Sequence, residues 1–319
     1  MGRRTAVKLL IKCLVTAVLL WAAFRRVDLA AIATLLSGTD PAWAALALLL
    51  TGFIVVSDAF LLSSVLRMFE RRATFATALI YSLVGWFFSN VALSTVGGDI
   101  FRGIQLSRVG TPVGAAMRII LCQRLLSFAT LVIVMIGGFP LAFGYVHRGG
   151  DLMLLGVILA VSVTGLSLLV MISRFPRSPS LDQWSVFRKL QTLSSDFGSL
   201  LAPTQRNLGA WTAALSQHLL RVAILATLAM ALKLDIGLPV LFAFTPAALL
   251  VAMIPISFGG WGVREFSFVY LLGEAGVGAE AALSLSIAFG LLRVVVGGIG
   301  GVVWALLDEK YYRVDARAA

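Results

Sequence analysis

Two polar breaks in apolar sequence decide the fold of this chain: Thr95-Val96-Gly97-Gly98-Asp99-Ile100-Phe101-Arg102 and Ser257-Phe258-Gly259-Gly260-Trp261-Gly262-Val263-Arg264. In each, a hydroxyl residue stands two positions before a glycine pair, and an arginine stands five positions after the first glycine. Glycine pairs interrupt helices, and non-helical backbone at membrane depth is tolerated only where protein buries it or a watery cavity borders it. The two breaks therefore indicate a repeat whose halves meet at a transport-type binding site.

The composition is that of an integral membrane protein. Of 319 residues, 60% are hydrophobic and 13% are charged, and the mean hydropathy is +0.97; soluble domains are far more polar. Apolar stretches long enough to cross a hydrocarbon layer of ~30 Å as helices lie at about 7–24, 41–66, 78–96, 116–144, 152–172, 208–232, 238–256 and 281–307. Because these stretches lack the alternation of membrane strands, we expect an all-α polytopic helix bundle.

The net charge of +11 is first a signal of topology, and nucleic-acid binding is the weaker interpretation. Positively charged segments tend to stay cytoplasmic, and four segments are basic: 1–12, 67–72, 173–206 and 310–317. The connections at 25–40, 233–237 and 272–281 lack a positive excess. We therefore expect the four basic segments, and with them both termini, on the cytoplasmic side.

Simple alternation of eight full spans would place the basic 173–206 loop outside. The charge of every loop matches its side of the membrane if two stretches are re-entrant. The first, 78–96, enters from the cytoplasm, turns at Gly97-Gly98 and returns to the same side; the second, 238–256, enters from outside and turns at Gly259-Gly260. The chain then has six full spans and two re-entrant hairpins related as an inverted repeat, as in alternating-access transporters. A 19-residue stretch is also long enough to cross fully, which is the alternative.

We expect one membrane domain over 1–319, with repeat halves at about 67–172 and 207–307 joined by the 173–206 loop. The loop's apolar and basic residues predict a short amphipathic helix on an anionic membrane surface, and a solvated linker is the alternative. The start of the chain is interpreted as an uncleaved first span, rather than a cleaved signal peptide, because no clear cleavage site precedes Arg25-Arg26.

Each half supplies one arginine after its glycine pair and one in the following span: Arg102 and Arg124, then Arg264 and Arg293. An arginine at mid-membrane costs about 2.5–3.5 kcal/mol on insertion scales, so these side chains are expected to face water, carboxylates or an anionic ligand. Guanidinium groups suit phosphate because their planar fork donates two hydrogen bonds. With Thr95, Ser257, Asp99 and Glu265, they form the candidate substrate-binding set.

A structural role is the alternative for these arginines. Asp58, Asp99 and Glu265 can neutralise them as buried ion pairs, and we expect Arg118 and Arg221 to anchor span ends. Four arginines against three carboxylates still leave positive charge in excess, which favours an anionic ligand.

Other chemistry has little support. The histidines are His147, beside an external turn, and His218, within an apolar helix, and no cysteine or carboxylate stands at metal-ligand spacing. We therefore expect no metal, no cofactor and no catalytic nucleophile. Asp58 and Asn90 are more typical of hydrogen bonds between helices, and His218 of a satisfied residue within the bundle.

At these residues the chain resembles a known family. The runs Val91–Arg102 and Ile254–Glu265, together with Gln123-Arg124, resemble the flippase-like membrane domain of lysylphosphatidylglycerol synthases and its stand-alone bacterial and archaeal relatives. The similarity covers nearly the whole chain, and the second run is the more specific. Asp99 stands where that family's first motif has Glu.

The resemblance implies a multi-pass protein of the bacterial or archaeal cytoplasmic membrane that moves phospholipid-like molecules between leaflets. The soluble aminoacyl-transferase domain of the bifunctional relatives is not expected here. Our leading hypothesis is a translocase for an anionic phospholipid or polyprenyl-phosphate lipid. The alternatives are a membrane-embedded enzyme acting on lipid phosphates, with Asp99 or Glu265 as base, and a non-catalytic partner of a lipid-modifying or glycan-assembly enzyme.

Overall fold

The computed structural model describes residues 29–71, 73–91, 96–146, 149–174, 184–202, 204–254 and 261–306, together with Leu14, and this part of the chain is helical without a strand. The predicted all-α class is confirmed. The helices are α2 (Leu29–Ser37), α3 (Pro41–Met68), α4 (Phe75–Val91), α5 (Gly97–Arg108), α6 (Val113–Ala142), α7 (Gly149–Ile172), α9 (Ser185–Leu201), α10 (Leu208–Ala231), α11 (Leu238–Ala252), α12 (Val263–Gly273) and α13 (Ala279–Leu306).

Five of the described helices are long and apolar enough to cross a membrane. They are α3, α6, α7 from Leu152, α10 and α13, and they correspond to five of the six predicted full spans. The sixth, at 7–24, lies outside the described residues. The multi-pass helical architecture therefore agrees with the sequence.

The first long span begins where the sequence supplies a strong start signal. Asp40 is the N-cap of α3, and its side chain accepts a hydrogen bond from the backbone nitrogen of Ala42 at 2.8 Å. Pro41 follows as the first helical residue, where its missing N–H costs nothing because that donor has no partner inside the helix. This cap fixes where α3 begins, and the 28-residue helix then places Asp58 inside the bundle.

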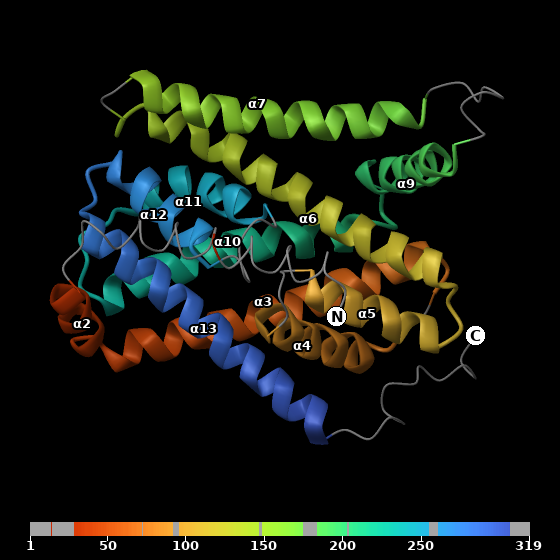
Figure 1. Ribbon diagram of the computed structural model, residues 1–319, viewed down its shortest axis with the longest axis horizontal. Helices are drawn as coiled ribbons and strands as arrows, with labels where there is room; N and C mark the ends of the chain where they lie inside the picture. Colours follow the sequence, from red (N-terminus) through yellow and green to blue (C-terminus); the bar gives the residue numbers. More distant parts are fainter. Residues whose placement is uncertain are drawn as a thin grey trace.

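The two breaks each join a pair of short helices. The helices α4 and α5 have 17 and 12 residues, which at a rise of 1.5 Å gives lengths of about 26 and 18 Å. Figure 1 shows that the start of α4 and the end of α5 lie at the same end of the molecule. This pair therefore returns toward the side from which it came.

The second pair has the opposite orientation. The helices α11 and α12 have 15 and 11 residues and pack against each other. The start of α11 and the end of α12 lie at the other end of the molecule, near α2 (Figure 1). The two short pairs thus enter the bundle from opposite ends.

Helix packing is related between the two halves. The helices α3 and α10, which precede the two short pairs, pack extensively against each other. In addition, α4 packs on α13 and α11 packs on α6, so the first helix of each short pair contacts the long helix that follows the other short pair. Glycines permit these close contacts: a Cβ on Gly300 would collide with the carbonyl of Leu83, and a Cβ on Gly138 with that of Phe242.

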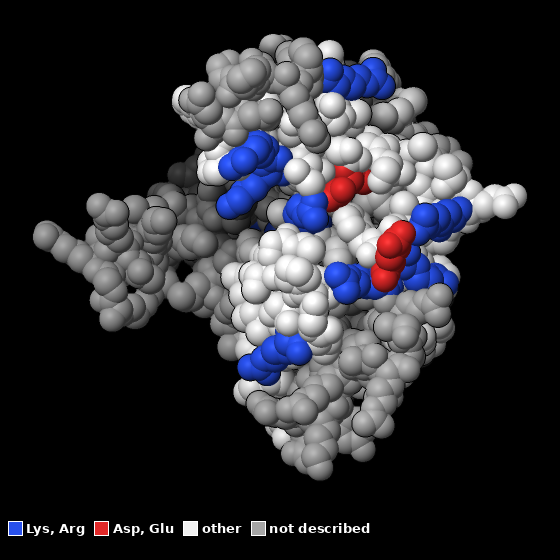
Figure 2. Space-filling model, turned by 90° about the vertical axis from the view of Figure 1, so that its right-hand side faces the viewer, with Lys and Arg blue, Asp and Glu red and all other residues white. Residues whose placement is uncertain are grey.

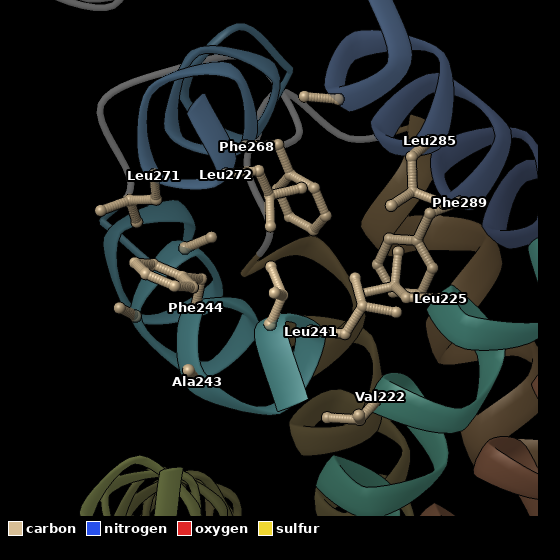
Figure 3. Packing of buried hydrophobic residues seen from close by; sticks show 14 of the residues in the cluster. Val222, Leu225, Leu241, Ala243, Phe244, Phe268, Leu271, Leu272, Leu285 and Phe289 are labelled. Carbon is tan, nitrogen blue, oxygen red and sulfur yellow. The ribbon is translucent and has the colours of Figure 1, made fainter. Parts of the chain in front are cut away.

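The largest apolar core holds the second short pair in place. Figure 3 shows Phe244 and Leu241 of α11, Phe268 of α12 and Phe289 of α13 converging with Leu225 of α10. Each of these five side chains is at most 3% exposed. Burying a large apolar side chain contributes roughly 1.5–3 kcal/mol, so the core is sufficient to fix the position of α12.

The predicted amphipathic helix in the 173–206 loop is α9. Phe197 and Leu200 are buried against α6 and α7, whereas Trp184 and Val186 are exposed. The Ser194 hydroxyl accepts from the backbone nitrogen of Ser173 at 2.8 Å, which attaches α9 to the end of α7. Contact with a membrane surface stays a prediction.

Basic side chains gather at the end of the molecule that carries α9. Figure 2 shows this end, where blue side chains are spread over the face with few red ones among them. Arg67 and Arg71 at the end of α3, Arg174 after α7, and Arg188 and Lys189 of α9 belong to it. These residues come from the segments whose charge predicted a common side.

Candidate functional site

A cavity of about 230 Å³ lies between eight helices. Residues from α3, α4, α5, α6, α10, α11, α12 and α13 line it, but none from α2, α7 or α9. The long helices contribute residues near their midpoints: Arg293 is about 20 Å from either end of α13 at 1.5 Å per residue. The short helices contribute the ends that adjoin the two breaks, with Ser89 and Asp99 on one side and Met253 and Arg264 on the other.

Five arginines line this cavity. They are Arg102 of α5, Arg124 of α6, Arg221 of α10, Arg264 of α12 and Arg293 of α13. The structure thus brings together all four arginines that the sequence singled out, and it adds a fifth. Such a concentration of guanidinium groups at mid-length of apolar helices is costly unless charges or water compensate it.

In the first half, arginines and carboxylates form a connected network. Arg102 Nη2 donates to Asp58 Oδ2 at 2.5 Å, and Arg124 Nε lies 2.7 Å from Asp99 Oδ2. Asp99 also lies 4.0 Å from Arg102 Nη1, and Gln123 Nε2 donates to Asp58 Oδ1 at 3.0 Å. Asp58, which the sequence suggested as helix-linking or neutralising, joins α3, α5 and α6 in this way.

In the second half, the arginine is paired with its own neighbour. Arg264 Nε donates to Glu265 Oε1 at 3.0 Å, and Arg264 Nη2 also contacts this oxygen. The other carboxylate oxygen accepts from Gly262 N at 2.6 Å, at the start of α12. Gly262 has φ of 87°, a conformation that favours glycine. The indole of Trp261 stacks on Arg264, with 4.6 Å from Cζ to the ring centroid.

Glycines make room for the two arginines that follow the breaks. A Cβ on Gly85 of α4 would lie 2.6 Å from Arg102 Nε, and a Cβ on Gly290 of α13 would collide with Arg264 Nη2. Since real Cβ atoms do not approach other heavy atoms so closely, any larger residue at these positions displaces the guanidinium. Gly85 and Gly290 are therefore part of the site.

The expectation that Gly97 and Gly98 form the hairpin turn needs correction. Both are the first residues of helix α5. Gly98 is required for a different reason: a Cβ there would collide with the carbonyl oxygen of Gly85 and the hydroxyl of Ser89. The glycine allows α5 to cross α4 closely.

The expectation that Arg221 anchors a span end is wrong. Helix α10 runs from Leu208 to Ala231 and places Arg221 near its middle, where it lines the cavity. Its Nη1 lies 3.0 Å from His218 Nδ1, and His218 Nε2 lies 2.8 Å from the Ser127 carbonyl. Because arginine is only a donor and a carbonyl only an acceptor, His218 is the neutral tautomer with its hydrogen on Nε2, and it orients Arg221.

Two of the five arginines have no carboxylate partner within the part of the chain that the structure describes. They are Arg221 and Arg293. Both are only partly buried in the protein, because the cavity borders them. At Arg293 the backbone carbonyl accepts from Asn90 Nδ2 at 2.8 Å, which fixes α13 against α4; this is the interhelical role that the sequence suggested for Asn90.

Glutamines supply further polar atoms without partners. Gln217 and Gln123 line the cavity and are 4% and 5% exposed. Among the described residues, Gln217 Nε2 and Gln123 Oε1 have no hydrogen-bond partner. A buried polar group without a partner is costly, so these atoms are expected to bind water or a ligand.

Arg118 gives a contrast at the end of a span, where the sequence predicted an anchor. It pairs with Asp196 of α9 at 3.0 Å, and the two side chains are 35% and 24% exposed. Burial raises the pKa of the Asp196 carboxyl, and Arg118 opposes that shift. Arg118 thus connects α6 to α9 and is not among the residues that line the cavity.

Four of the predicted site residues lie outside the described residues: Thr95, Ser257, Gly259 and Gly260. His147 does too. Among the residues that are described, no group of three or more histidines, cysteines and carboxylates is placed to hold a metal ion. The polar cavity residues that sequence analysis did not propose for the site include Arg221, His218 and Gln217.

Comparison with known proteins gives one result that covers most of the chain. A family model described as the lysylphosphatidylglycerol synthase TM region matches residues 9–301, which includes every described residue of the cavity. A search of curated proteins finds no significant match.

Proposed function

The chain belongs to the family defined by the lysylphosphatidylglycerol synthase TM region, and from this membership and the arginine-lined cavity we propose that it moves an anionic lipid between the leaflets of a membrane. The phosphate-bearing headgroup enters the cavity while the tails stay in the hydrocarbon. The lipid is an anionic phospholipid or a polyprenyl-phosphate-type lipid.

The position of the charge carries this proposal. Five arginines lie near the mid-length of the long helices or in the first half of the short helices α5 and α12, which corresponds to the middle of the bilayer. Ion pairing accounts for Arg102, Arg124 and Arg264, but not for Arg221 and Arg293. Intramembrane cations that face a cavity are typical of substrate or ion pathways.

The arrangement of the helices supports a transport mechanism. We infer that α4–α5 and α11–α12 are re-entrant hairpins that enter from the cytoplasmic and outer sides, and that the halves at 67–172 and 207–307 form an inverted repeat within one membrane domain. Their entry from opposite ends and the exchanged packing of α4 on α13 and α11 on α6 support this inference. Binding at the interface of inverted repeats is the arrangement used for alternating access.

The same inference places the basic end in Figure 2, and therefore both termini, on the cytoplasmic side of a bacterial or archaeal inner membrane. In this orientation Arg102 and Arg124 serve the cytoplasm-facing half of the pathway. Arg264 and Arg293 serve the outward-facing half.

The alternative of a lipid-phosphate enzyme has no specific geometric support. Asp58, Asp99 and Glu265 each contact an arginine, and a general base needs a free acceptor within reach of the proton it removes. The other alternative is a non-catalytic partner of a lipid-modifying or glycan-assembly enzyme. Both alternatives are outcomes of the test below.

The test is reconstitution of the purified protein in liposomes with fluorescent phosphatidylglycerol and phosphatidic acid. Leaflet exchange is followed by quenching at the outer surface, and lipids are extracted to detect new products. We expect exchange without product, slowed by Arg293→Gln and unchanged by Arg118→Gln, the matched arginine outside the cavity. A new product would support an enzyme, and the absence of both exchange and product would support a partner role.

A further inference from the structure

The charges around the cavity do not balance, and the imbalance has a defined size. The positive groups are Arg102, Arg124, Arg221, Arg264 and Arg293. The negative groups are Asp58 and Asp99, which line the cavity, and Glu265, which is bound to Arg264. Among the described residues, five positive and three negative charges leave a surplus of two positive charges.

The two stretches that join α4 to α5 and α11 to α12, residues 92–95 and 255–260, contain no Asp, Glu, Lys or Arg in the sequence. His218 adds no charge, because its Nε2 hydrogen is directed at a carbonyl and its Nδ1 accepts from Arg221. The surplus is therefore carried by Arg221 and Arg293.

The two surplus cations lie on α10 and α13, and both line the same cavity. They are accompanied by Gln217 Nε2, a buried amide donor without a partner among the described residues. Two guanidinium groups and the Gln217 amide nitrogen offer N–H donors, which suit phosphate oxygens. Gln123 Oε1, an acceptor without a partner among the described residues, lines the same cavity. A low dielectric at mid-membrane also strengthens the electrostatic interaction between each of these cations and an anion.

On the premise of the proposed lipid transport, we propose that the cavity selects lipids whose headgroup carries two negative charges, a phosphate monoester or a diphosphate, and that Arg221 and Arg293 make this selection. A dianion restores neutrality. A phosphodiester such as phosphatidylglycerol leaves one cation unpaired, and a zwitterion such as phosphatidylethanolamine leaves two.

The size of the cavity is consistent with a compact headgroup. Its volume of about 230 Å³ is below the ~300–1,000 Å³ of pockets that enclose drug-sized ligands. A terminal phosphate needs little space, whereas a glycan headgroup needs far more. The same chemistry is offered by free phosphate, so the experiment includes it separately.

The experiment compares exchange of labelled phosphatidic acid, phosphatidylglycerol and phosphatidylethanolamine, each at the same mole fraction in phosphatidylcholine liposomes. It is done at pH 8, where a phosphate monoester with a second pKa near 6 carries roughly two charges. Since one more charge-assisted hydrogen bond changes an equilibrium by at least about tenfold, we expect phosphatidic acid to exchange at least tenfold faster than phosphatidylglycerol.

The variants Arg221→Gln and Arg293→Gln each lower the surplus to one. We expect each to reduce the preference for phosphatidic acid over phosphatidylglycerol by roughly tenfold, because a monoanion then balances the cavity. Arg293→Lys retains the charge and keeps the preference, and Arg118→Gln leaves it unchanged. Because these variants remove a cation without a counter-ion, their folded yield is expected to equal or exceed that of the parent.

A second measurement tests the selection of doubly charged headgroups independently of transport. The thermal stability of the detergent-solubilised protein is measured with added phosphatidic acid, phosphatidylglycerol or inorganic phosphate. Greater stabilisation by phosphatidic acid than by phosphatidylglycerol supports dianion selection, and equal stabilisation by inorganic phosphate identifies free phosphate as the ligand. Equal exchange of the two lipids would overturn the charge selection but leave the translocase. No exchange of any lipid would overturn the translocase, and the stability series would still decide the charge selection.

Discussion

The pair Arg264–Glu265 offers a direct measure of how much of the site is structural. Arg264 is 3% exposed and Glu265 is fully buried. Glu265 accepts from Arg264 through one oxygen and from Gly262 N through the other. The change Arg264→Met removes the cation and leaves a buried carboxylate that still accepts from the Gly262 backbone N–H and from the Ser286 hydroxyl at 3.4 Å.

Removing one member of a buried ion pair costs about 3–5 kcal/mol, because the other charge stays desolvated. At roughly 2–4 °C per kcal/mol for a domain of this order of size, the melting temperature of Arg264→Met is expected to fall by about 6–20 °C. In Arg264→Met with Glu265→Gln the amide still accepts from Gly262 N, and the unpaired charge is gone. Most of the lost stability is therefore expected to return.

The assay is thermal unfolding of the detergent-solubilised protein, together with folded yield and lipid exchange. The control is Arg118→Met, which breaks the partly exposed pair with Asp196; such pairs contribute ~0–1 kcal/mol. Equal losses for Arg264→Met and Arg118→Met, or no recovery in the double variant, would refute the buried-pair reasoning. Full exchange in the double variant would show that Arg264 acts only on structure.

Two further predictions concern the frame around the cavity. Gly300→Leu should lower folded yield and melting temperature, because its Cβ collides with the Leu83 carbonyl and overpacking costs about 1–3 kcal/mol or more. The matched control is Gly298→Leu, because nothing lies within 4 Å of a Cβ at that position. Equal effects of the two changes would contradict this account of α4–α13 packing. For topology, single cysteines at positions 74 and 109, after replacement of Cys13 and Cys122, should be labelled from the cytoplasmic side only, and cysteines at 236 and 277 from the outside only. Labelling of position 109 from outside would show that 78–96 is a full span.

Much of the architecture could be predicted because it depends on local features of the sequence, such as the length of an apolar stretch or the position of a glycine pair. Apolar length identified α3, α6, α7, α10 and α13, and these helices were found. The glycine pairs marked the places where short helices meet, and the arginines after them face one cavity. Inside a membrane the free energy cost of an isolated charge is high, so arginines within several apolar stretches are expected to face one shared polar site.

The parts that could not be predicted depend on helix rotation and on partners distant in sequence. Arg221 was assigned to a span end although it stands near the middle of the apolar stretch, and a signal was therefore present in the sequence. Its lack of an ion pair among the described residues was not predictable, since Asp58 is bound by Arg102 and Gln123 from two other helices. The role of Gly98 was also hidden, because it depends on how closely α5 crosses α4.

The pairing pattern divides the five arginines into two kinds. Arg102, Arg124 and Arg264 carry both the contacts that join helices and a share of the cavity wall, so they are fixed whether or not a ligand is bound. Arg221 and Arg293 form no ion pair with a carboxylate in the described chain, and a fold selected for stability alone would replace them with apolar residues. The free energy cost of these two desolvated cations is offset only when an anion enters the cavity. The ion pairs that would bind the headgroup are therefore the ones that Arg221 and Arg293 lack in the empty cavity. A site built in this way binds an anion without first breaking an ion pair, and it can release the anion to either side if the two halves open in turn.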